Sequence, residues 1–216
     1  MTTKPLTLEH LVRPSNLTGK APLILMLHGY GSDEKDLFSF APELPEKYMV
    51  VSARAPYHLA YGNAWYEINF DEFDDKFNNI EQAVESRREI EIFIEELIDN
   101  YPVDASEITL LGFSQGTILS YALALSHPEK VKQVIALSGY VDENMLKENY
   151  HQHDYSSLRF FCSHGTSDQV IPVEWARKTK IFLDNLHIEN TYSEYPVGHG
   201  VSPQNFKDLK NWLSES

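Results

Sequence analysis

Long apolar runs and disulfides are missing from this sequence. No segment approaches the roughly 20 apolar residues of a membrane-spanning helix, and residues 1–7 lack the apolar core of a signal peptide. Cys162 is the only cysteine, so it cannot form an internal disulfide, and its neighbours Phe160 and Phe161 indicate a buried thiol. We therefore expect a cytoplasmic protein without a membrane span.

Positive charge is scarce as well. The chain has 18 Lys and Arg against 32 Asp and Glu, which gives a formal net charge of −14. Nucleic-acid binding depends on clustered Lys and Arg, so we expect no nucleic acid as a partner. Repeats, low-complexity tracts and linker-like stretches are also missing, so the 216 residues are predicted to form one domain over 1–216. The sequence leaves a homodimer open.

Short aliphatic runs alternate with helical patterns along the chain. The runs are typical of strands buried on both faces, and the clearest helical pattern has an apolar stripe opposite Glu and Arg. This alternation predicts an α/β fold whose mostly parallel sheet carries helices on both faces. Strands are predicted at 22–28, 48–52, 108–113, 134–137, 158–162 and 191–195, and helices at 79–100, 115–126, 173–187 and 203–213.

Two segments, 54–78 and 140–157, do not fit this alternation. The first is rich in aromatic residues and contains an acidic cluster, and the second is polar. In open α/β sheets the ligand binds beyond the carboxyl ends of the strands, where such loops carry function. Trp65 and Tyr66 in the first segment are therefore expected to line a substrate pocket; a hydrophobic plug under a long loop is the alternative.

The run Gly112-Phe113-Ser114-Gln115-Gly116 joins a predicted strand to a predicted helix. A Gly-x-Ser-x-Gly run in that setting is typical of a nucleophile on a sharp, strained turn, where side chains at the two glycines would collide with the strand and the helix. The helix amino terminus also brings partial positive charge beside the serine. Ser114 is therefore predicted to be a catalytic nucleophile, with a simple helix N-cap as the alternative.

A serine nucleophile needs an imidazole base, which a carboxylate orients. In hydrolases with this turn the acid and then the base follow the serine along the chain. Six of the nine histidines follow Ser114, and His199 is favoured among them because a glycine-flanked loop leaves its imidazole room to reach the serine. A surface loop histidine is the alternative. The other five are His127, His151, His153, His164 and His187.

Asp168 is the predicted acid. It comes shortly after the strand 158–162, at the edge where a parallel sheet presents its ligand-binding loops. Asp142 and Asp154 are rivals, but no strand ends immediately before either of them. A turn-capping role is the alternative for Asp168.

Acyl transfer also needs two N–H donors aimed at the developing oxyanion. The backbone of Gln115 is predicted to supply one of them. The backbone of Tyr30 is predicted to supply the other, because Gly29 and Gly31 let the loop after strand 22–28 approach the substrate. His28 is expected to support this loop rather than to act as a base.

Together these motifs resemble the phospholipase/carboxylesterase family of α/β-hydrolases, which includes bacterial carboxylesterases and acyl-protein thioesterases. The resemblance runs from about residue 21 to the end. It implies a metal-free triad of Ser114, Asp168 and His199 with no cofactor, and N–H donors from Tyr30 and Gln115. The segments that carry it are 27–32, 55–56, 65–66, 112–116, 136–140, 164–172 and 198–199.

Two features bear on the substrate. Thr117 stands where the family often has a second glycine, and no stretch resembles the long apolar lid expected for a lipidated protein substrate. We therefore predict a carboxylesterase that cleaves small-molecule esters of small to medium acyl chains through an acyl-enzyme on Ser114. An acyl-protein thioesterase or lysophospholipase is the alternative, and a slow-turnover ligand-binding receptor on the same fold is the alternative from another class.

Overall fold

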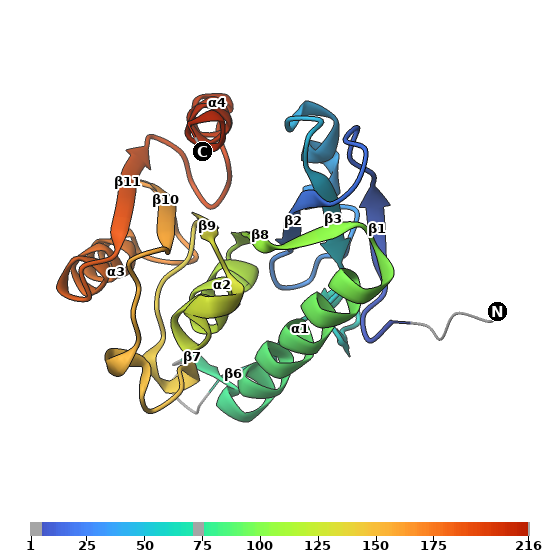
Figure 1. Cartoon of the computed structure of the whole chain (residues 1–216). Helices are drawn as coiled ribbons and strands as arrows, with labels where there is room; N and C mark the ends of the chain where they lie inside the picture. Colours follow the sequence, from blue (N-terminus) through green and yellow to red (C-terminus); the bar gives the residue numbers. More distant parts are fainter. Residues whose placement is uncertain (1–5, 71–75, 216) are drawn as a thin grey trace.

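A seven-stranded sheet forms the centre of the protein (Figure 1), in a computed structural model that describes residues 6–70 and 76–215. Its strand order is β1-β3-β2-β8-β9-β10-β11, with β1 antiparallel to β3 and the other neighbours parallel. All six predicted strands lie in it, which confirms the mostly parallel sheet. Its strands are β1 (His10–Arg13), β2 (Ala21–Leu27), β3 (Met49–Ala53), β8 (Val103–Phe113), β9 (Gln133–Leu137), β10 (Arg159–Gly165) and β11 (Glu189–Tyr195).

Helices cover both faces of the sheet, as predicted (Figure 1). Alternate residues of β2 point to opposite faces: Leu23 and Leu25 belong to the core layer that contains the buried residues of α1, α2 and α3, whereas Ile24 and Met26 belong to the layer that contains those of α4 and the short helix η1. The hydrophobic core is therefore divided by the sheet into two layers. The helices are η1 (Leu37–Glu43), α1 (Ile80–Asn100), α2 (Gln115–Ser126), η2 (Pro128–Lys130), η3 (Glu143–Met145), η4 (Tyr150–Gln152), α3 (Val173–Asn185) and α4 (Pro203–Ser214).

Helix α2 is the most enclosed element. All of its residues are buried, because its sequence is mostly apolar or small and the helix packs against β8, β9 and α1. Thr117 fills the space under its first turn, where its hydroxyl donates to the Leu137 carbonyl over 2.7 Å and accepts from the Leu137 N–H over 3.0 Å. A Cβ on Gly139 would lie 2.5 Å from the Thr117 side chain, so the threonine and this glycine fit each other. The start of α2 is thereby held rigidly against β9.

The sequence patterns missed β1 and the first half of β8. The residues of β1 are only partly buried at the sheet edge, and residues 103–107 are mostly polar, so neither segment has the apolar run of a central strand. Backbone pairing extends β8 instead, through the pair Ala21 and Val103 beyond a bulge.

The irregular segment 54–78 contains two small antiparallel hairpins rather than open loop. They pair β4 (Tyr57–His58) with β5 (Asn63–Ala64) and β6 (Ile68–Phe70) with β7 (Lys76–Asn78). The acidic cluster predicted here falls on residues 71–75, which lie outside the described residues. No helix within 6–70 and 76–215 is long and apolar enough to cross a membrane.

Candidate active site

Ser114 lies at the carboxyl end of β8, the middle strand of the sheet, in a strained backbone conformation. Its φ of 53° and ψ of −116° are rare for a residue with a side chain. The turn depends on its glycines: a Cβ on Gly116 would lie 1.9 Å from the Leu27 carbonyl oxygen, and one on Gly112 would lie 2.5 Å from the Gly116 oxygen. The hydroxyl is therefore presented above the sheet on a turn that only glycine neighbours permit.

Ser114, His199 and Asp168 are brought together from three separate loops. The Ser114 hydroxyl donates to Nε2 of His199 over 2.9 Å, and Nδ1–H of His199 donates to Oδ2 of Asp168 over 2.7 Å. The Phe113 ring packs against the imidazole, with ring centroids 4.9 Å apart. This geometry gives the imidazole one nitrogen for the serine proton and ties the other to a carboxylate.

Asp168 is fully buried at its side chain, and its carboxylate accepts several hydrogen bonds. Besides His199, the backbone N–H groups of Val170 and Ile171 donate to Oδ1 over 2.8 and 2.9 Å. Burial by itself would raise the pKa of the Asp168 carboxyl, but the hydrogen bonds from His199 and the backbone outweigh it and hold the pKa below its usual value. Asp168 therefore stays ionised and can stabilise an imidazolium.

His164 approaches the same carboxylate oxygen as His199 does and is fully buried. Its Nε2 lies 2.8 Å from the Ile171 carbonyl oxygen and 3.3 Å from Oδ2 of Asp168. Both neighbours are acceptors, so this nitrogen carries the proton. By sequence, His164 is only one of the histidines that follow Ser114; the structure places it where it helps to fix the loop of Asp168.

A close approach of two loops sets the distance between Asp168 and His199. A Cβ on Gly165 would lie 2.2 Å from the Gly198 carbonyl oxygen, so the loop of Asp168 and the loop of His199 meet where only glycine fits. The Ser167 N–H also donates to the Val197 carbonyl over 3.0 Å. The pair is thus held by backbone contacts as well as by its own hydrogen bond.

The two predicted oxyanion donors lie beside the serine. A Cβ on Gly29 would lie 3.4 Å from the Ser114 Cβ, so the loop after β2 passes directly against Ser114. Gln115 is the first residue of α2, where N–H groups lack an intrahelical acceptor. Among the described residues, neither the Tyr30 N–H nor the Gln115 N–H has a hydrogen-bond acceptor. Both remain available to a substrate oxygen.

His28 supports this loop, in line with the expectation for it. The residue is fully buried, its Nδ1–H donates to the Gly29 carbonyl over 2.7 Å, and its Nε2 accepts from the Ala55 N–H over 3.1 Å. Burial lowers the pKa of His28, so the imidazole is neutral.

An ion pair holds the far side of the same loop. Glu34 is buried, and its two carboxylate oxygens accept from the Arg54 guanidinium over 2.6 and 2.8 Å; Arg54 also pairs with Glu9. The hydrogen bonds from Arg54 lower the pKa of Glu34 to about 2. The loop that carries Tyr30 is therefore tied to the end of β3.

Trp65 requires a correction, because it does not line the cavity as expected. It is fully buried, with its indole N–H donating to the His28 carbonyl over 2.9 Å and its backbone N–H donating to the Gln115 side chain over 2.8 Å. The Gln115 amide also donates to the Tyr66 carbonyl over 2.7 Å. Trp65 is thus the hydrophobic plug of the alternative reading, whereas Tyr66 does line the cavity.

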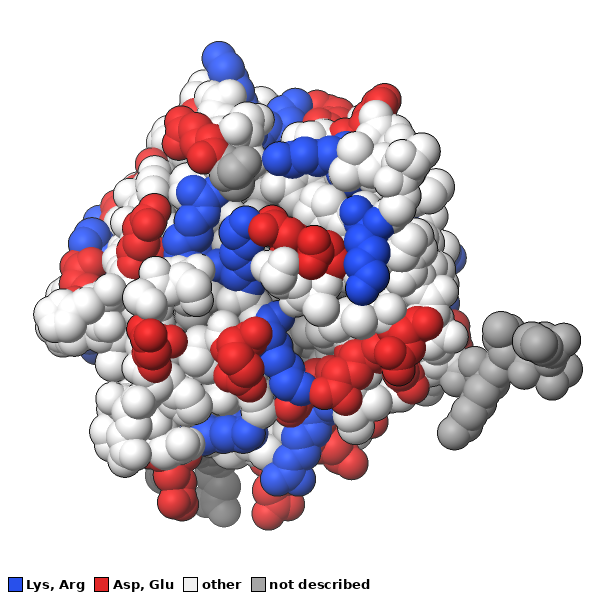
Figure 2. Space-filling model, in the orientation of Figure 1, with Lys and Arg blue, Asp and Glu red and all other residues white. Residues whose placement is uncertain are grey.

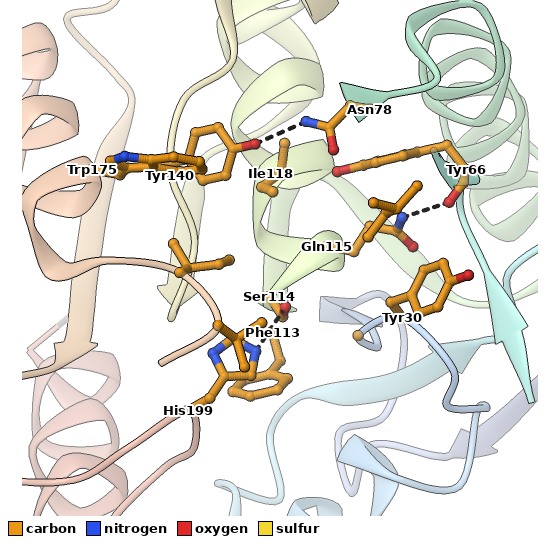
Figure 3. A pocket seen from close by; sticks show the side chains of 14 residues that line it. Tyr30, Tyr66, Asn78, Phe113, Ser114, Gln115, Ile118, Tyr140, Trp175 and His199 are labelled. Atoms are coloured by element: carbon orange, nitrogen blue, oxygen red, sulfur yellow. Dashed lines mark hydrogen bonds between the residues drawn. The ribbon is translucent and has the colours of Figure 1, made fainter. Parts of the chain in front are cut away.

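The cavity beside Ser114 has a volume of about 450 Å³ (Figure 3). Gly29, Tyr30, Ser114 and His199 form its reactive end, and Figure 3 shows Tyr66, Asn78, Tyr140 and Trp175 away from the serine at the other end. The last three come from segments far apart in the chain. Sequence reasoning assigned no site role to Asn78, Tyr140 or Trp175, and the only signal was the departure of two of their segments from the strand-helix alternation.

Charge does not single out a site for a polyanion. On the face of the described residues that Figure 2 shows, Lys and Arg side chains lie among Asp and Glu. Within residues 6–70 and 76–215, no three His, Cys, Asp or Glu side chains are grouped so that they could hold a metal ion.

Comparison with known proteins matches the chain to one family model, to acyl-protein thioesterases by sequence, and to esterases by structure. A family model described as phospholipase/carboxylesterase matches residues 12–216. The acyl-protein thioesterase 1 of Cryptococcus neoformans is 28% identical over 98% of this chain and 99% of its own length. The acyl-protein thioesterase 1 of Yarrowia lipolytica is 28% identical over 89% of this chain and 91% of its own.

Solved structures have the same fold. Esterase PE8 is similar with a TM-score of 0.82 and 24% identity, covering 96% of this chain and 98% of the esterase. The Bacillus cereus carboxylesterase is similar with a TM-score of 0.81 and 22% identity, covering 96% of this chain and 94% of the carboxylesterase. These likenesses establish the α/β-hydrolase architecture of the chain.

Proposed function

The chain belongs to the phospholipase/carboxylesterase family of hydrolases, and on that premise we propose that it hydrolyses carboxylic esters of small to medium acyl groups through an acyl-enzyme on Ser114. The observation that carries this proposal is the unbroken line of hydrogen bonds from the Ser114 hydroxyl through His199 to Asp168. These three residues are the proposed triad.

In the acylation step His199 Nε2 removes the Ser114 proton while Oγ attacks the ester carbonyl carbon. The carbonyl oxygen becomes an oxyanion, and the N–H groups of Tyr30 and Gln115 are the proposed donors to it. The carboxylate of Asp168 stabilises the imidazolium that forms. His199 then returns the proton to the leaving alcohol, and the acyl group stays on Ser114.

In the deacylation step a water molecule takes the place of the alcohol. His199 removes one proton from this water, whose oxygen attacks the acyl carbon, and the same N–H groups stabilise the second oxyanion. The bond to Ser114 breaks, the imidazolium returns its proton to Oγ, and a carboxylic acid leaves. Two-step kinetics of this kind produce a burst when acylation is faster than deacylation.

The size of the cavity supports small to medium acyl groups. About 450 Å³ lies toward the lower end of the usual 300 to 1,000 Å³ of small-molecule sites. The side chains of Tyr66, Tyr140 and Trp175 line the end of the cavity away from the serine, so they limit the length of an acyl group that extends from Ser114.

A second candidate function is thioester hydrolysis, which the acyl-protein thioesterase relatives favour. The same serine, base and oxyanion donors would serve both reactions, because a thiolate leaves without needing more from the protein than an alcohol does. The leaving group and the chain length of the acyl group therefore have to be separated by experiment.

The proposal is tested with para-nitrophenyl esters from acetate to dodecanoate, together with an oxygen ester and a thioester of the same acyl group. We expect kcat/KM to peak at short or medium chains, with the oxygen ester cleaved at least as well as the thioester. Rising rates up to dodecanoyl with strong preference for the thioester would make the chain a thioesterase. A single burst followed by almost no turnover would instead indicate a slow-turnover receptor.

A further inference from the structure

The end of the cavity away from Ser114 carries hydrogen-bonding side chains as well as apolar ones. Figure 3 shows the Tyr66 hydroxyl pointing toward the space beside Ile118, with the Asn78 side chain near it and the Tyr140 ring across that space. The Asn78 side-chain amide donates to the Tyr140 hydroxyl over 2.8 Å. Three hydrogen-bonding groups therefore face a cavity whose other walls are largely apolar.

The hydrogen-bonding capacity of this end is only partly used. The Asn78 NH₂ group also donates to the Asp142 carboxylate over 3.1 Å, so both of its protons are engaged. The Tyr140 hydroxyl accepts from Asn78, and among the described residues its own proton has no acceptor. Burial raises the pKa of Tyr66 well above its usual value, and that of Tyr140 is raised for the same reason, so both hydroxyls keep their protons. The Tyr66 hydroxyl accepts a hydrogen bond from the Gln115 side chain, and among the described residues its proton has no acceptor either, so two phenolic donors are left for a ligand.

Aromatic rings surround these donors. The Tyr140 ring meets the Trp175 indole edge to face, with centroids 4.8 Å apart, and the fully buried Tyr66 ring lies on the other side of the cavity. Flat walls of this kind suit a ring better than a flexible chain, because aromatic pairs gain from their geometry in addition to the area that they bury.

An alkyl chain would fit this end poorly. It would displace water from the two hydroxyls and give them no partner, and a buried polar group without a partner is costly. An acyl group with its own hydrogen-bonding group at the far end would replace that water. Sites built around buried polar groups reject the analogue that lacks the matching group much more strongly than apolar sites discriminate by size.

We propose that the cavity selects hydroxyaryl acyl groups, in which a phenolic hydroxyl at the far end of the acyl chain is hydrogen-bonded by Tyr66 and Tyr140. The inference rests on the proposed function, since it names the substrate class of the same site. It makes Tyr66 and Tyr140 specificity-determining residues of an ester hydrolase.

Matched pairs of para-nitrophenyl esters test this. Each pair has the same acyl chain with a phenyl or a para-hydroxyphenyl end, and phenylacetyl, phenylpropanoyl and phenylbutanoyl pairs together cover the reach of the cavity. The measured quantity is the ratio of kcat/KM between the two members. For the chain length that fits best we expect a preference of about tenfold or more for the hydroxylated ester, as one or two added hydrogen bonds would give.

Phenylalanine variants connect the preference to the two tyrosines. Tyr66→Phe and Tyr140→Phe should each reduce the preference to about threefold or less, because each removes one hydroxyl and retains the ring. Tyr61→Phe is the matched control: this tyrosine is 87% exposed and does not line the cavity, so the preference should stay at the wild-type value. Melting temperatures show whether each variant is folded.

The outcomes distinguish a failure of this inference from a failure of the proposed ester hydrolysis. If the wild-type protein cleaves para-nitrophenyl acetate but shows no preference for the hydroxylated ester at any of the three lengths, the inference is wrong and the proposed function stands. The inference is equally wrong if Tyr61→Phe abolishes the preference as fully as Tyr66→Phe does. If the acetate itself is not cleaved, the proposed function fails and the inference fails with it.

Discussion

The two ends of the cavity are built in different ways. At the reactive end, backbone contacts that leave no room for a Cβ at Gly112, Gly116 and Gly165 fix the turn of Ser114 and the loops of Asp168 and His199. At the other end, Asn78, Tyr140 and Trp175 belong to β7, the loop after β9 and α3, and no local motif ties them together. The comparison indicates that reactivity is encoded in short runs of residues, whereas specificity is spread over distant segments.

The largest expected effect is the loss of the nucleophile or of the base. Ser114→Ala and His199→Ala should each lower kcat on para-nitrophenyl acetate by about 10³-fold or more, because each removes one of two groups that act together. Steady-state kinetics on purified, folded variants provide the measurement. His153→Ala is the control for the base, and a loss as large as that of His199→Ala would show that the wrong histidine has been chosen.

A smaller effect is expected at His164, which contacts Asp168 but is hydrogen-bonded to neither His199 nor Ser114. His164→Phe should lower kcat by about 10- to 100-fold with little change in KM, since the Asp168 carboxylate loses a neighbour that holds its position. His164→Gln, which keeps a side-chain N–H, should recover part of the loss. Equal kcat values for the phenylalanine variant and the wild type would show that the reactive end does not need this support.

The Glu34 and Arg54 pair should affect stability more than rate. Because the pKa of Glu34 falls from an ordinary value of 4.5 to about 2 on folding, its contribution is complete above pH 4.5 and is lost as the pH drops toward 2. Glu34→Gln should therefore lower the free energy of unfolding by about 1 to 3 kcal/mol at pH 7, and by less at pH 3. Urea titrations at both pH values measure this, with the exposed Glu174→Gln as a control that should change little.

The smallest effect is expected at the other end of the cavity. Trp175→Leu keeps an apolar side chain but removes the edge-to-face contact with Tyr140. We expect KM for phenylpropanoyl esters to rise about two- to fivefold while kcat changes less. The lost contact stabilises the bound substrate and the transition state equally, so its removal weakens binding without raising the barrier from the bound substrate. A fall in kcat comparable to that of His164→Phe would remove the distinction between the two ends.

The sequence patterns anticipated which residues meet around Ser114, because the turn that carries Ser114 is determined locally. The boundaries predicted for α2 match the structure, α4 begins at residue 203 as predicted, and the strand and helix around Ser114 lie where the motif requires. Chain order then narrowed the histidines and aspartates to the pair that the structure brings within hydrogen-bond distance of each other and of Ser114.

Features that depend on pairing across the fold were not predicted. Strand β1 has too few apolar residues to be recognised, and it forms because β3 offers an open edge. Trp65 was expected in the cavity because of its position in an aromatic loop, but its burial beneath His28 depends on how that loop folds back on the sheet. The wall formed by Asn78, Tyr140 and Trp175 needs three segments in place at once, which single-sequence patterns do not specify.

The central claim is tested most directly by covalent labelling of the folded protein with a fluorophosphonate, followed by mass mapping of the adduct. The account predicts one adduct per chain, located on Ser114, and its absence from Ser114→Ala and from urea-unfolded protein. Stoichiometric labelling at a different residue, or no labelling of the folded protein, would contradict the assignment of Ser114 as the nucleophile.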